Sequence, residues 1–345
     1  MANLFFLVSG EHETLPVSEL KAILEAEGYS YQILEKLDQV IRIKADLACV
    51  EAIRRRSAFV RICAQELATC AADLRSIVKA THSIGFAGIL KDSNGFAVRV
   101  KHVREYSLDL DGMILERKLG ELVLDDAPEA RVRLKKPDRT FVGVLTEGRF
   151  VLGVKLAEIE PKPFVDRRPR GKPFFHPSAM QAKLARCMVN LAKAKSGDLL
   201  LDPFCGTGST LIEASFVGCR VLGLDIQRRM ARGTRRNLAF FKVQLEGVIV
   251  GDARCLPVTK MDCVVTDPPY GISSSTLKRT TSQIVEELLV AVHDCMEKGR
   301  RVCFAAPKTL KISGMCKALG YKHLESHFVY VHRSLTREVI VLEKV

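Results

Sequence analysis

The chain has 345 residues, of which 47% are hydrophobic and 27% are charged, and this ordinary globular composition excludes a disordered or collagen-like chain. At roughly 150 residues per domain, the length predicts two or three domains. The 53 Lys and Arg residues exceed the 40 Asp and Glu residues and give a net charge of +13, so a polyanionic partner is suspected first, although such a surplus can also be solubilising charge.

The first half of the chain alternates short strands and helices. Apolar runs predict strands at residues 4–8, 40–43, 59–62, 96–100, 131–134, 141–145 and 150–154. Helices are predicted at residues 16–28, 47–55, 71–81 and 107–122, the first of them opened by Pro16 and stopped by Gly28. This order predicts two small α+β layers, one after the other.

Residues 157–177 differ in character from what precedes them. They hold five prolines, and basic residues outnumber acidic ones. Because proline fixes φ and lacks a backbone donor, this segment is predicted to be an extended basic linker rather than a helix, and to mark a domain boundary. From residue 161 onward the chain has 30 basic and 16 acidic residues, so the charge surplus lies in the linker and beyond it.

After the linker, strands and helices alternate again. Strands are predicted at residues 199–201, 220–224, 248–250, 263–265 and 301–304, followed by two β-rich segments at the C-terminus. Helices are predicted at residues 179–194, 209–217, 227–240, 281–297 and 309–319. Apolar strands separated by helices are typical of a parallel sheet covered on both faces, the doubly wound α/β class.

Acidic residues follow three successive strands of this predicted sheet. Asp202 begins a loop with two glycines that opens a helix, where the backbone can approach a ligand closely. Asp225 can accept both hydroxyls of a ribose, and Asp252 can accept from an adenine amino group. Each of these features, taken singly, has a structural explanation that is as good as ligand binding or better. The glycine loop could be a tight turn, Asp225 a helix cap and Asp252 an ordinary loop residue. Together they converge on the crevice where such sheets bind ligands.

The sharpest signal is the motif Asp267-Pro268-Pro269-Tyr270, directly after a predicted strand. An amino group conjugated to a nucleobase is a poor nucleophile because its lone pair is delocalised. A carboxylate and a rigid carbonyl that each accept one amino hydrogen turn this lone pair toward an electrophile, and the ring of the tyrosine offers a stacking face. A proline-stiffened turn would explain an isolated Pro-Pro pair, but the glycine loop and the two acids favour chemistry on a nucleobase.

The order of these motifs resembles that of the class I S-adenosylmethionine-dependent amino-methyltransferases. Residues 170–177, 185–192 and 202–214 further resemble the archaeal tRNA guanosine-10 N2-methyltransferase family, and the catalytic match covers residues 170–271. By architecture, the resemblance implies a ferredoxin-like domain at 1–56, a THUMP RNA-binding domain at 57–156, the linker at 157–177 and a Rossmann-like methyltransferase domain at 178–345.

The resemblance implies methyl transfer from S-adenosylmethionine to the exocyclic N2 of a tRNA guanosine, giving N2-methylguanosine and, with a second transfer, N2,N2-dimethylguanosine. The guanine would be positioned by Asp267, Pro268 and Tyr270, and the released proton would go to Asp267 or to water. The residues implied in cofactor binding are Asp202, Phe204, Cys205, Gly206, Gly208, Asp225, Ile226, Asp252 and Ala253.

Three features of the resemblance leave a choice open. His176 could face the cofactor or stabilise the linker, and the two are weighed evenly. Ser178 and the pair Ser209-Thr210 stand where the family tends to have glycine, which leaves the path of the cofactor loop open. Some relatives also require a small zinc-containing activating subunit, which is a further expected partner beside tRNA.

Basic residues gather in two places. For the linker cluster Arg167, Arg168, Arg170 and Lys172 we favour RNA contact over a solvated surface. The predicted helix at 227–240 carries five arginines, which repel one another unless phosphates or acidic side chains face them. Whether this helix meets RNA or another domain stays open.

Two other functions are weighed against tRNA methylation. The same Asp-Pro-Pro-Tyr geometry serves methylation of adenine N6 or cytosine N4 in DNA or ribosomal RNA, but residues 1–155 show no helix-turn-helix or zinc pattern that would read DNA. A noncatalytic RNA-binding protein with a decayed methyltransferase fold should lose the cofactor acids first, whereas Asp202, Asp225, Asp252 and Asp267 are all present.

The cysteine spacing and the N-terminus bear on metal sites and location. The 11 cysteines are at least seven residues apart, so none forms the close pair that a zinc knuckle needs. The apolar run at residues 4–8 is too short for a signal peptide or a membrane span. The sequence therefore predicts free thiols, no metal, no membrane contact and a cytoplasmic location.

Overall fold

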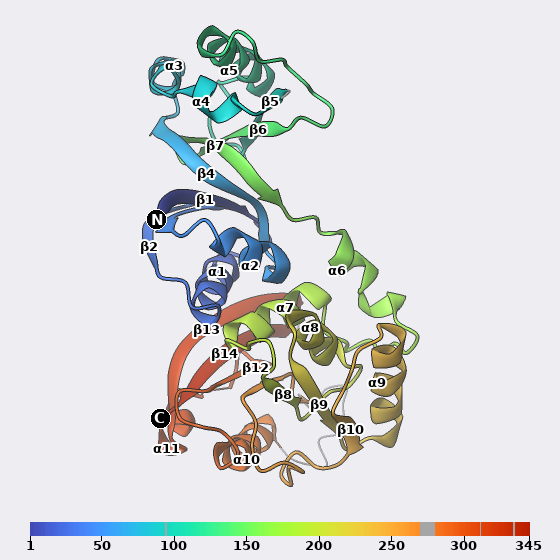
Figure 1. Cartoon of the computed structure of the whole chain (residues 1–345). Coiled ribbons are helices and arrows are strands. Elements are labelled where there is room, and N and C mark those ends of the chain that lie inside the picture. Colours follow the sequence, from blue (N-terminus) through green and yellow to red (C-terminus); the bar gives the residue numbers. More distant parts are fainter. Residues whose placement is uncertain (94, 270–279, 311, 334) are drawn as a thin grey trace. The chain divides into compact units, whose positions relative to one another are not determined.

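The computed structural model describes residues 1–93, 95–269, 280–310, 312–333 and 335–345. The chain divides into two compact units, and each is described by itself. The first unit comprises Met1–Glu13, Tyr29–Arg54 and Val60–Glu160, and the second comprises Thr14–Gly28, Arg55–Phe59 and Pro161–Val345. Each unit is built on one seven-stranded sheet (Figure 1).

The sheet of the first unit has the strand order β2-β3-β1-β4-β7-β6-β5. Its strands are β1 (Ala2–Val8), β2 (Tyr31–Leu37), β3 (Val40–Ala45), β4 (Val60–Ala71), β5 (Phe96–His102), β6 (Arg139–Thr146) and β7 (Arg149–Glu158). The helices are α2 (Cys49–Arg56), whose last two residues belong to the second unit, α3 (Leu74–His82), α4 (Phe86–Leu90) and α5 (Gly112–Asp126). The long strand β4 pairs with β1 and with β7, so one sheet runs through both segments for which N-terminal domains are expected.

Two predictions for this unit were wrong. Residues 131–134 form no strand but only an isolated bridge between Val132 and Phe96, because Val132 and Leu134 are exposed and have no core to cover. Strand β2 was missed because its residues alternate between half-buried and exposed, as is typical of a sheet edge, and none of them is fully buried.

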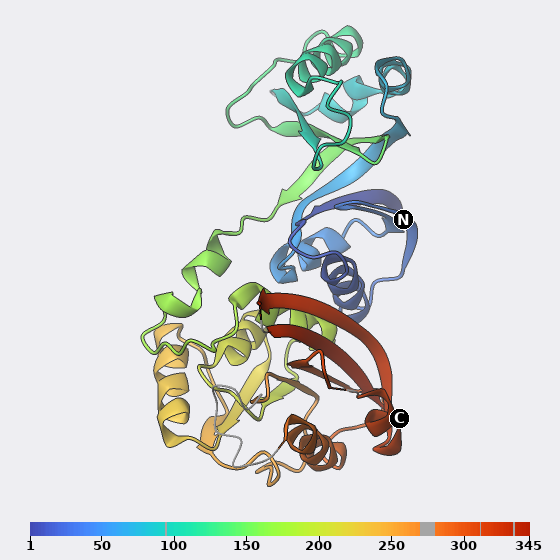
Figure 2. The same ribbon diagram turned by 180° about the vertical axis from the view of Figure 1, so that it is seen from behind.

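The second unit confirms the predicted doubly wound class, with the strand order β10-β9-β8-β11-β12-β14-β13. Its strands are β8 (Leu199–Asp202), β9 (Arg220–Asp225), β10 (Gly247–Val250), β11 (Cys263–Thr266), β12 (Arg301–Pro307), β13 (Tyr321–His332) and β14 (Leu335–Lys344). The first five are parallel, and β14 and β13 add an antiparallel edge, seen from behind in Figure 2.

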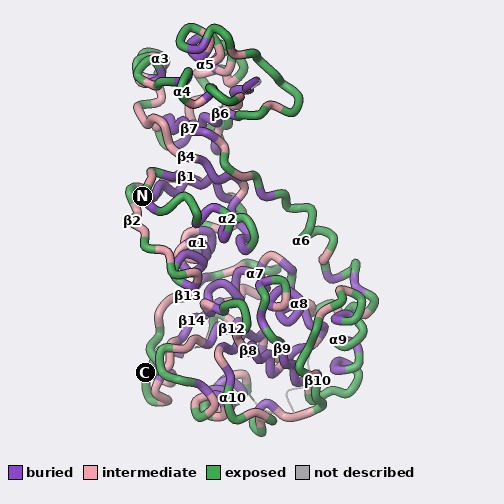
Figure 3. The backbone as a smooth tube through the Cα atoms, viewed as in Figure 1, coloured by how far each residue is buried: buried purple, intermediate pink, exposed green. Residues whose placement is uncertain are grey.

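Helices lie on both faces of this sheet. The helices of this unit are α1 (Leu15–Ala26), α6 (Lys162–Asp166), α7 (Ala182–Leu191), α8 (Ser209–Val217), α9 (Arg228–Phe240), α10 (Thr281–His293), α11 (Ser313–Ala318) and the 3-10 helix η1 (Pro169–Gly171). Two of them, α1 and α6, pack on α7. Alternate strand residues face opposite cores: Leu200 and Val265 pack with α7 and α8, whereas Leu201 and Val264 pack with α10. Figure 3 shows the buried residues concentrated along these strands.

The prediction that the linker has no helix was wrong. Residues 162–166 form the short helix α6, and η1 follows it. Pro161 and Pro163 lie at the start of α6, where the absent N–H would have no partner inside the helix in any case. An ion pair between Lys162 Nζ and Asp166 Oδ2, 2.7 Å apart, spans the turn.

Candidate active site

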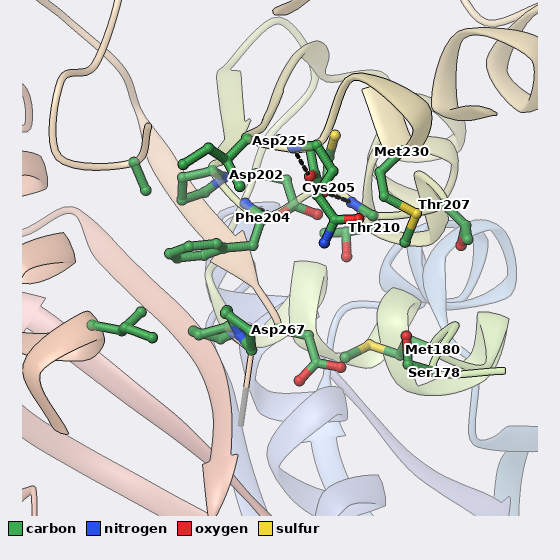
Figure 4. Close-up of a pocket in the computed structure, with 18 of the residues that line it drawn as sticks. Ser178, Met180, Asp202, Phe204, Cys205, Thr207, Thr210, Asp225, Met230 and Asp267 are labelled. Carbon is green, nitrogen blue, oxygen red and sulfur yellow. Dashed lines mark hydrogen bonds between the residues drawn. The ribbon is translucent and has the colours of Figure 1, made fainter. Parts of the chain in front are cut away.

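A cavity of about 410 Å³ lies at the carboxyl ends of the parallel strands of the second unit (Figure 4). The structure brings ten of the predicted site residues together around it, because parallel strands end at the same edge of a sheet. They are Asp202, Phe204, Cys205, Gly206, Asp225, Ile226, Asp252, Ala253, Asp267 and Pro268. Tyr270 lies outside the described residues.

The loop between β8 and α8 has the conformation that its glycines predict. Gly206 and Gly208 have φ values of +52° and +76°, which favour residues without a side chain. A Cβ on Gly208 would also lie 2.9 Å from Thr234 Cγ2. Thr234 donates to the Gly206 carbonyl at 2.8 Å, so α9 holds the loop in place. Gly208 itself does not line the cavity, but Thr207 and Ser209 do.

Asp225 and Asp252 are fixed by their own loops. Asp225 accepts from the backbone N–H groups of Gly206, at 3.0 Å, and Gln227, at 2.8 Å, while burial raises its pKa. Asp252 forms an ion pair with Arg254 at 2.7 Å. Each carboxylate oxygen has a second lone pair, so Asp225 can still accept from hydroxyl groups in the cavity.

Asp202 connects the glycine loop to the Asp-Pro-Pro segment. Its side chain is almost fully buried, and this burial raises its pKa to about 7. One carboxylate oxygen accepts from Thr266 Oγ1 at 2.6 Å and from the Phe204 N–H at 3.2 Å. Because Thr266 directly precedes Asp267, the position of one loop constrains the other.

Asp267 has a partner that the sequence analysis missed. Arg337 Nη2, on β14, lies 3.2 Å from Asp267 Oδ2, and both side chains are mostly buried. The guanidinium stabilises the negative charge of the carboxylate and fixes its direction. No local sequence pattern joins the two residues, since Arg337 reaches the site only through the antiparallel pairing of β14 with β12. Val331, His332 and Leu335, from the β13–β14 hairpin, line the same cavity and were also missed.

The residues that depart from the family pattern have identifiable contacts. Ser178, Ser209 and Thr210 all line the cavity. Ser209 Oγ donates to the Met180 carbonyl at 2.9 Å, which ties the start of α8 to the chain that follows the linker. His176 does not line the cavity, and its Nδ1 lies 2.7 Å from Ser178 Oγ. His176 therefore contacts a residue of the cavity lining, Ser178, but is not itself part of the lining.

The linker cluster divides into buried and exposed members. Arg167 forms an ion pair with the buried Glu213 at 2.6 Å. Lys172 is only 7% exposed, donates to Ser209 Oγ at 2.6 Å, and has its pKa lowered to about 8 by burial. Arg168 and Arg170 are exposed. Only these two of the four predicted RNA-binding residues lie where a phosphate can reach them in this conformation.

The described residues contain neither a metal-binding cluster nor a membrane-spanning helix. No group of three or more His, Cys, Asp or Glu side chains is arranged to hold a metal ion in that part of the chain. Within the same ranges, every helix is too short or too polar to cross a bilayer.

Comparisons with known proteins agree on one kind of relative. Residues 169–337 match a family model described as RMKL-like, methyltransferase domain. A tRNA (guanine(10)-N2)-dimethyltransferase from Methanothermobacter thermautotrophicus is 38% identical over 99% of this chain and 100% of its own length. Crystal structures of TrmN from Thermus thermophilus (20% identity, TM-score 0.56, all of both chains) and of SMU.472, a putative methyltransferase complexed with SAH (13% identity, TM-score 0.53, 100% and 98% of the chains), share the fold.

Proposed function

Because this chain belongs to the tRNA (guanine(10)-N2)-dimethyltransferase family, we propose that it transfers methyl groups from S-adenosylmethionine to the exocyclic N2 of guanosine 10 in tRNA. The observation that carries the proposal is the shared cavity of Asp267, Pro268 and the glycine loop. The name of the relative supports two successive transfers to the same nitrogen. The relationship disfavours DNA adenine or cytosine as the substrate.

The cavity fits the cofactor in size and in the kinds of groups that line it. The N-terminus of α8 and the loop before it offer backbone N–H groups to the methionine carboxylate. Asp225 accepts from the ribose, and Ile226 and Ala253 border the place of the adenine, with Asp252 beside them. The bound cofactor supplies a methyl group on a positively charged sulfur, which is the electrophile.

The protein's part in the reaction is to orient the amino group. The Asp267 carboxylate and the Pro268 carbonyl each accept one hydrogen of guanine N2, which turns the nitrogen lone pair toward the methyl group. Arg337 holds the carboxylate in position. The released proton passes to Asp267 or to water. Tyr270 follows in the same motif as the stacking residue.

The exposed residues Arg168 and Arg170 contact the tRNA backbone in this proposal. The enzyme meets its tRNA substrate in the cytoplasm. A small zinc-containing subunit, if this chain needs one, would raise turnover when added to the purified protein.

Replacement of Asp267 by Asn tests the proposal at the reacting group. Asp267→Asn keeps the shape but puts a donor where an acceptor is needed, so kcat for tRNA methylation should fall by about 100- to 10,000-fold. Affinities for tRNA and S-adenosylhomocysteine should change little. The control is Asp294→Asn, because the Asp294 side chain is 92% exposed and lies outside the cavity lining. If Asp267→Asn turned over as fast as this control, the assigned chemistry would be wrong.

A further inference from the structure

Helix α9 presents five arginines on its exposed side. We call Arg228, Arg229, Arg232, Arg235 and Arg236 the arginine face, and all five are exposed. At 100° per residue they fall within one arc of about 120°. The opposite side of the helix is buried against the second unit, through Met230, Ala231, Thr234 and Leu238 among others. The arginines are therefore segregated by the fold as well as clustered in the sequence.

The arginine face is not balanced by acidic groups. Among the described residues, no Asp or Glu forms an ion pair with any of its five members. Arg228, Arg232 and Arg236 follow one another at i, i+4 spacing, where like charges repel. Arg228 and Arg229 also lie in the first turn, where the helix dipole disfavours cations, and that turn has no acidic residue. This arrangement weakens the isolated helix, so stability does not explain it.

Two members of the face have side-chain contacts of their own among the described residues, and for the other three the described part of the chain shows none. Arg235 donates to the Val248 carbonyl on β10. Arg229 Cζ lies 5.9 Å from the centroid of the Phe174 ring, within the limit of about 6 Å for attraction between a cation and an aromatic ring. These contacts explain in part why arginine stands at positions 229 and 235. In the described fold, no contact of this kind explains the positive charges of Arg228, Arg232 and Arg236.

The arginine face is connected to the active site and to the linker. Gln227 and Met230, at the start of α9, line the cavity. Asn237 on the same helix donates to the carbonyls of Thr207, at 2.8 Å, and Phe174, at 2.9 Å, and so joins α9 to the cofactor loop and to the linker. The exposed Arg170 lies over the next ring along the linker, Phe175. Helix α9 is thus anchored beside the cavity by its buried side, and the arginine face lies on the opposite, exposed side of the same helix.

We propose that the arginine face binds the sugar–phosphate backbone of the tRNA substrate while the target guanosine occupies the cavity. The inference rests on the proposed function, to which it adds a docking surface. Guanidinium groups suit this partner because they bind phosphate oxygens in a bidentate manner and stay charged. The backbone of RNA presents a row of phosphates that one helix face can follow, and such contacts fix register without reading sequence.

Two matched triple variants test the proposal in the full-length chain. The first variant combines Arg228→Gln, Arg232→Gln and Arg236→Gln. It removes three positive charges, keeps residues that favour a helix and leaves Arg229 and Arg235 unchanged. The control combines Lys298→Gln, Lys317→Gln and Lys322→Gln, which removes the same charge from exposed lysines away from α9. A third variant with lysine at positions 228, 232 and 236 keeps the charge. Thermal unfolding and S-adenosylhomocysteine binding report whether each variant is folded.

The affinity for tRNA and the kinetics of methylation are measured at salt concentrations from ~50 to 300 mM. Over this range the release of counterions from the phosphates makes tRNA affinity depend on salt. The arginine-to-glutamine variant should bind tRNA roughly 10- to 50-fold more weakly near physiological salt, with a log–log salt slope reduced by about 2 to 3. KM for tRNA should rise while kcat at saturating tRNA stays unchanged. The lysine variant should keep most of the slope, and the control should resemble the original chain.

The possible results separate this proposal from the proposed function. Suppose that the original chain methylates tRNA and that the arginine-to-glutamine variant binds tRNA as well as the lysine-to-glutamine control does. The arginine face is then not a docking surface for tRNA, and an acidic protein would be its more suitable partner. If the original chain methylates no tRNA, the proposed function fails. The salt slopes for tRNA binding then still decide whether the arginine face binds RNA.

Discussion

Two carboxylates in the active site have different surroundings. Asp267 Oδ2 lies 3.2 Å from the charged guanidinium of Arg337. Asp202 is buried beneath the cofactor loop, its hydrogen bonds come from the neutral groups of Thr266 and Phe204, and its pKa is raised to about 7. At neutral pH Asp202 is therefore poised between its protonated and its ionised form.

The state of Asp202 should make cofactor affinity depend on pH. We assign to Asp202 the ammonium group in the methionine part of the cofactor. Around pH 6 the carboxyl of Asp202 is mostly protonated and neutral, and around pH 8 it is mostly ionised and would attract this ammonium group. Affinity for S-adenosylhomocysteine should therefore rise about 10-fold from pH 6 to pH 8 and then level off. Titration calorimetry across this range measures it. Asp202→Asn should bind weakly with a flatter profile, and a flat profile in the unaltered chain would refute the assignment.

Single residues were predictable from the sequence where a strand or a loop positions them locally. Asp202, Asp225 and Asp252 follow strand ends, and the structure places all three on one cavity. Arg337 was not predictable, because it reaches Asp267 only through long-range pairing of β14. Lys172 was misjudged for a related reason: its sequence neighbours are basic and exposed, but its amine turns inward to Ser209.

At the scale of elements, α9 and the linker are held together by close packing. Gly233 lets the Phe174 ring lie directly on the helix, because a Cβ at this position would come within 2.0 Å of Phe174 Cδ1. The Phe174 N–H donates to Asn237 Oδ1 at 2.8 Å, next to this contact. Since Asn237 also holds the cofactor loop, the linker, the helix and the loop form one assembly.

A methyl group at Gly233 should loosen this assembly. Gly233→Ala forces Phe174 away, so it should destabilise the second unit by about 1–3 kcal/mol and weaken S-adenosylhomocysteine binding. The matched control is Gly120→Ala in α5, where a Cβ meets nothing within 4 Å. That change should stabilise its helix by about 0.5–1 kcal/mol and leave ligand binding unaltered. Thermal unfolding with and without ligand compares the two, and equal effects would contradict the packing argument.

Most helices and strands of the second unit were predictable because their signals are local. Helix α8 and strand β9 begin where the sequence predicts, after a glycine loop and after Gly218-Cys219. Helix α6 was missed because prolines were weighed as helix breakers, although they lie at its start. The half-buried edge strand β2 was missed because alternation with few buried positions gives a weak pattern.

At the scale of the whole molecule, the chain order does not coincide with the compact units. Helix α1 and residues 55–59 belong to the second unit, where the buried carboxylate of Glu19 accepts from the N–H groups of Ala58 and Phe59 and from Asn190 Nδ2. Such an arrangement leaves no local signal, since the contacting segments are far apart in sequence. The composition predicts a boundary in the linker, whereas this exchange of segments has no signal in the sequence.

The surplus of positive charge lies in the same part of the chain as the candidate active site. The segment from residue 161 onward carries the surplus of basic residues, and it also holds the cavity and the arginine face. Electrostatic attraction should therefore act mainly where the methyl group is transferred. This distribution fits a polyanionic substrate that must bring one base into a buried cavity.

Identification of the methylated nucleoside tests the central claim most directly. The purified chain is incubated with labelled S-adenosylmethionine and one of three substrates: unmodified tRNA, the same tRNA with guanosine 10 replaced by adenosine, or duplex DNA. Digestion and chromatography then identify the labelled nucleoside. The account predicts N2-methylguanosine and N2,N2-dimethylguanosine from the unmodified tRNA and no label in the other two. Label in N6-methyladenosine or N4-methylcytosine, or label that survives replacement of guanosine 10, would contradict it.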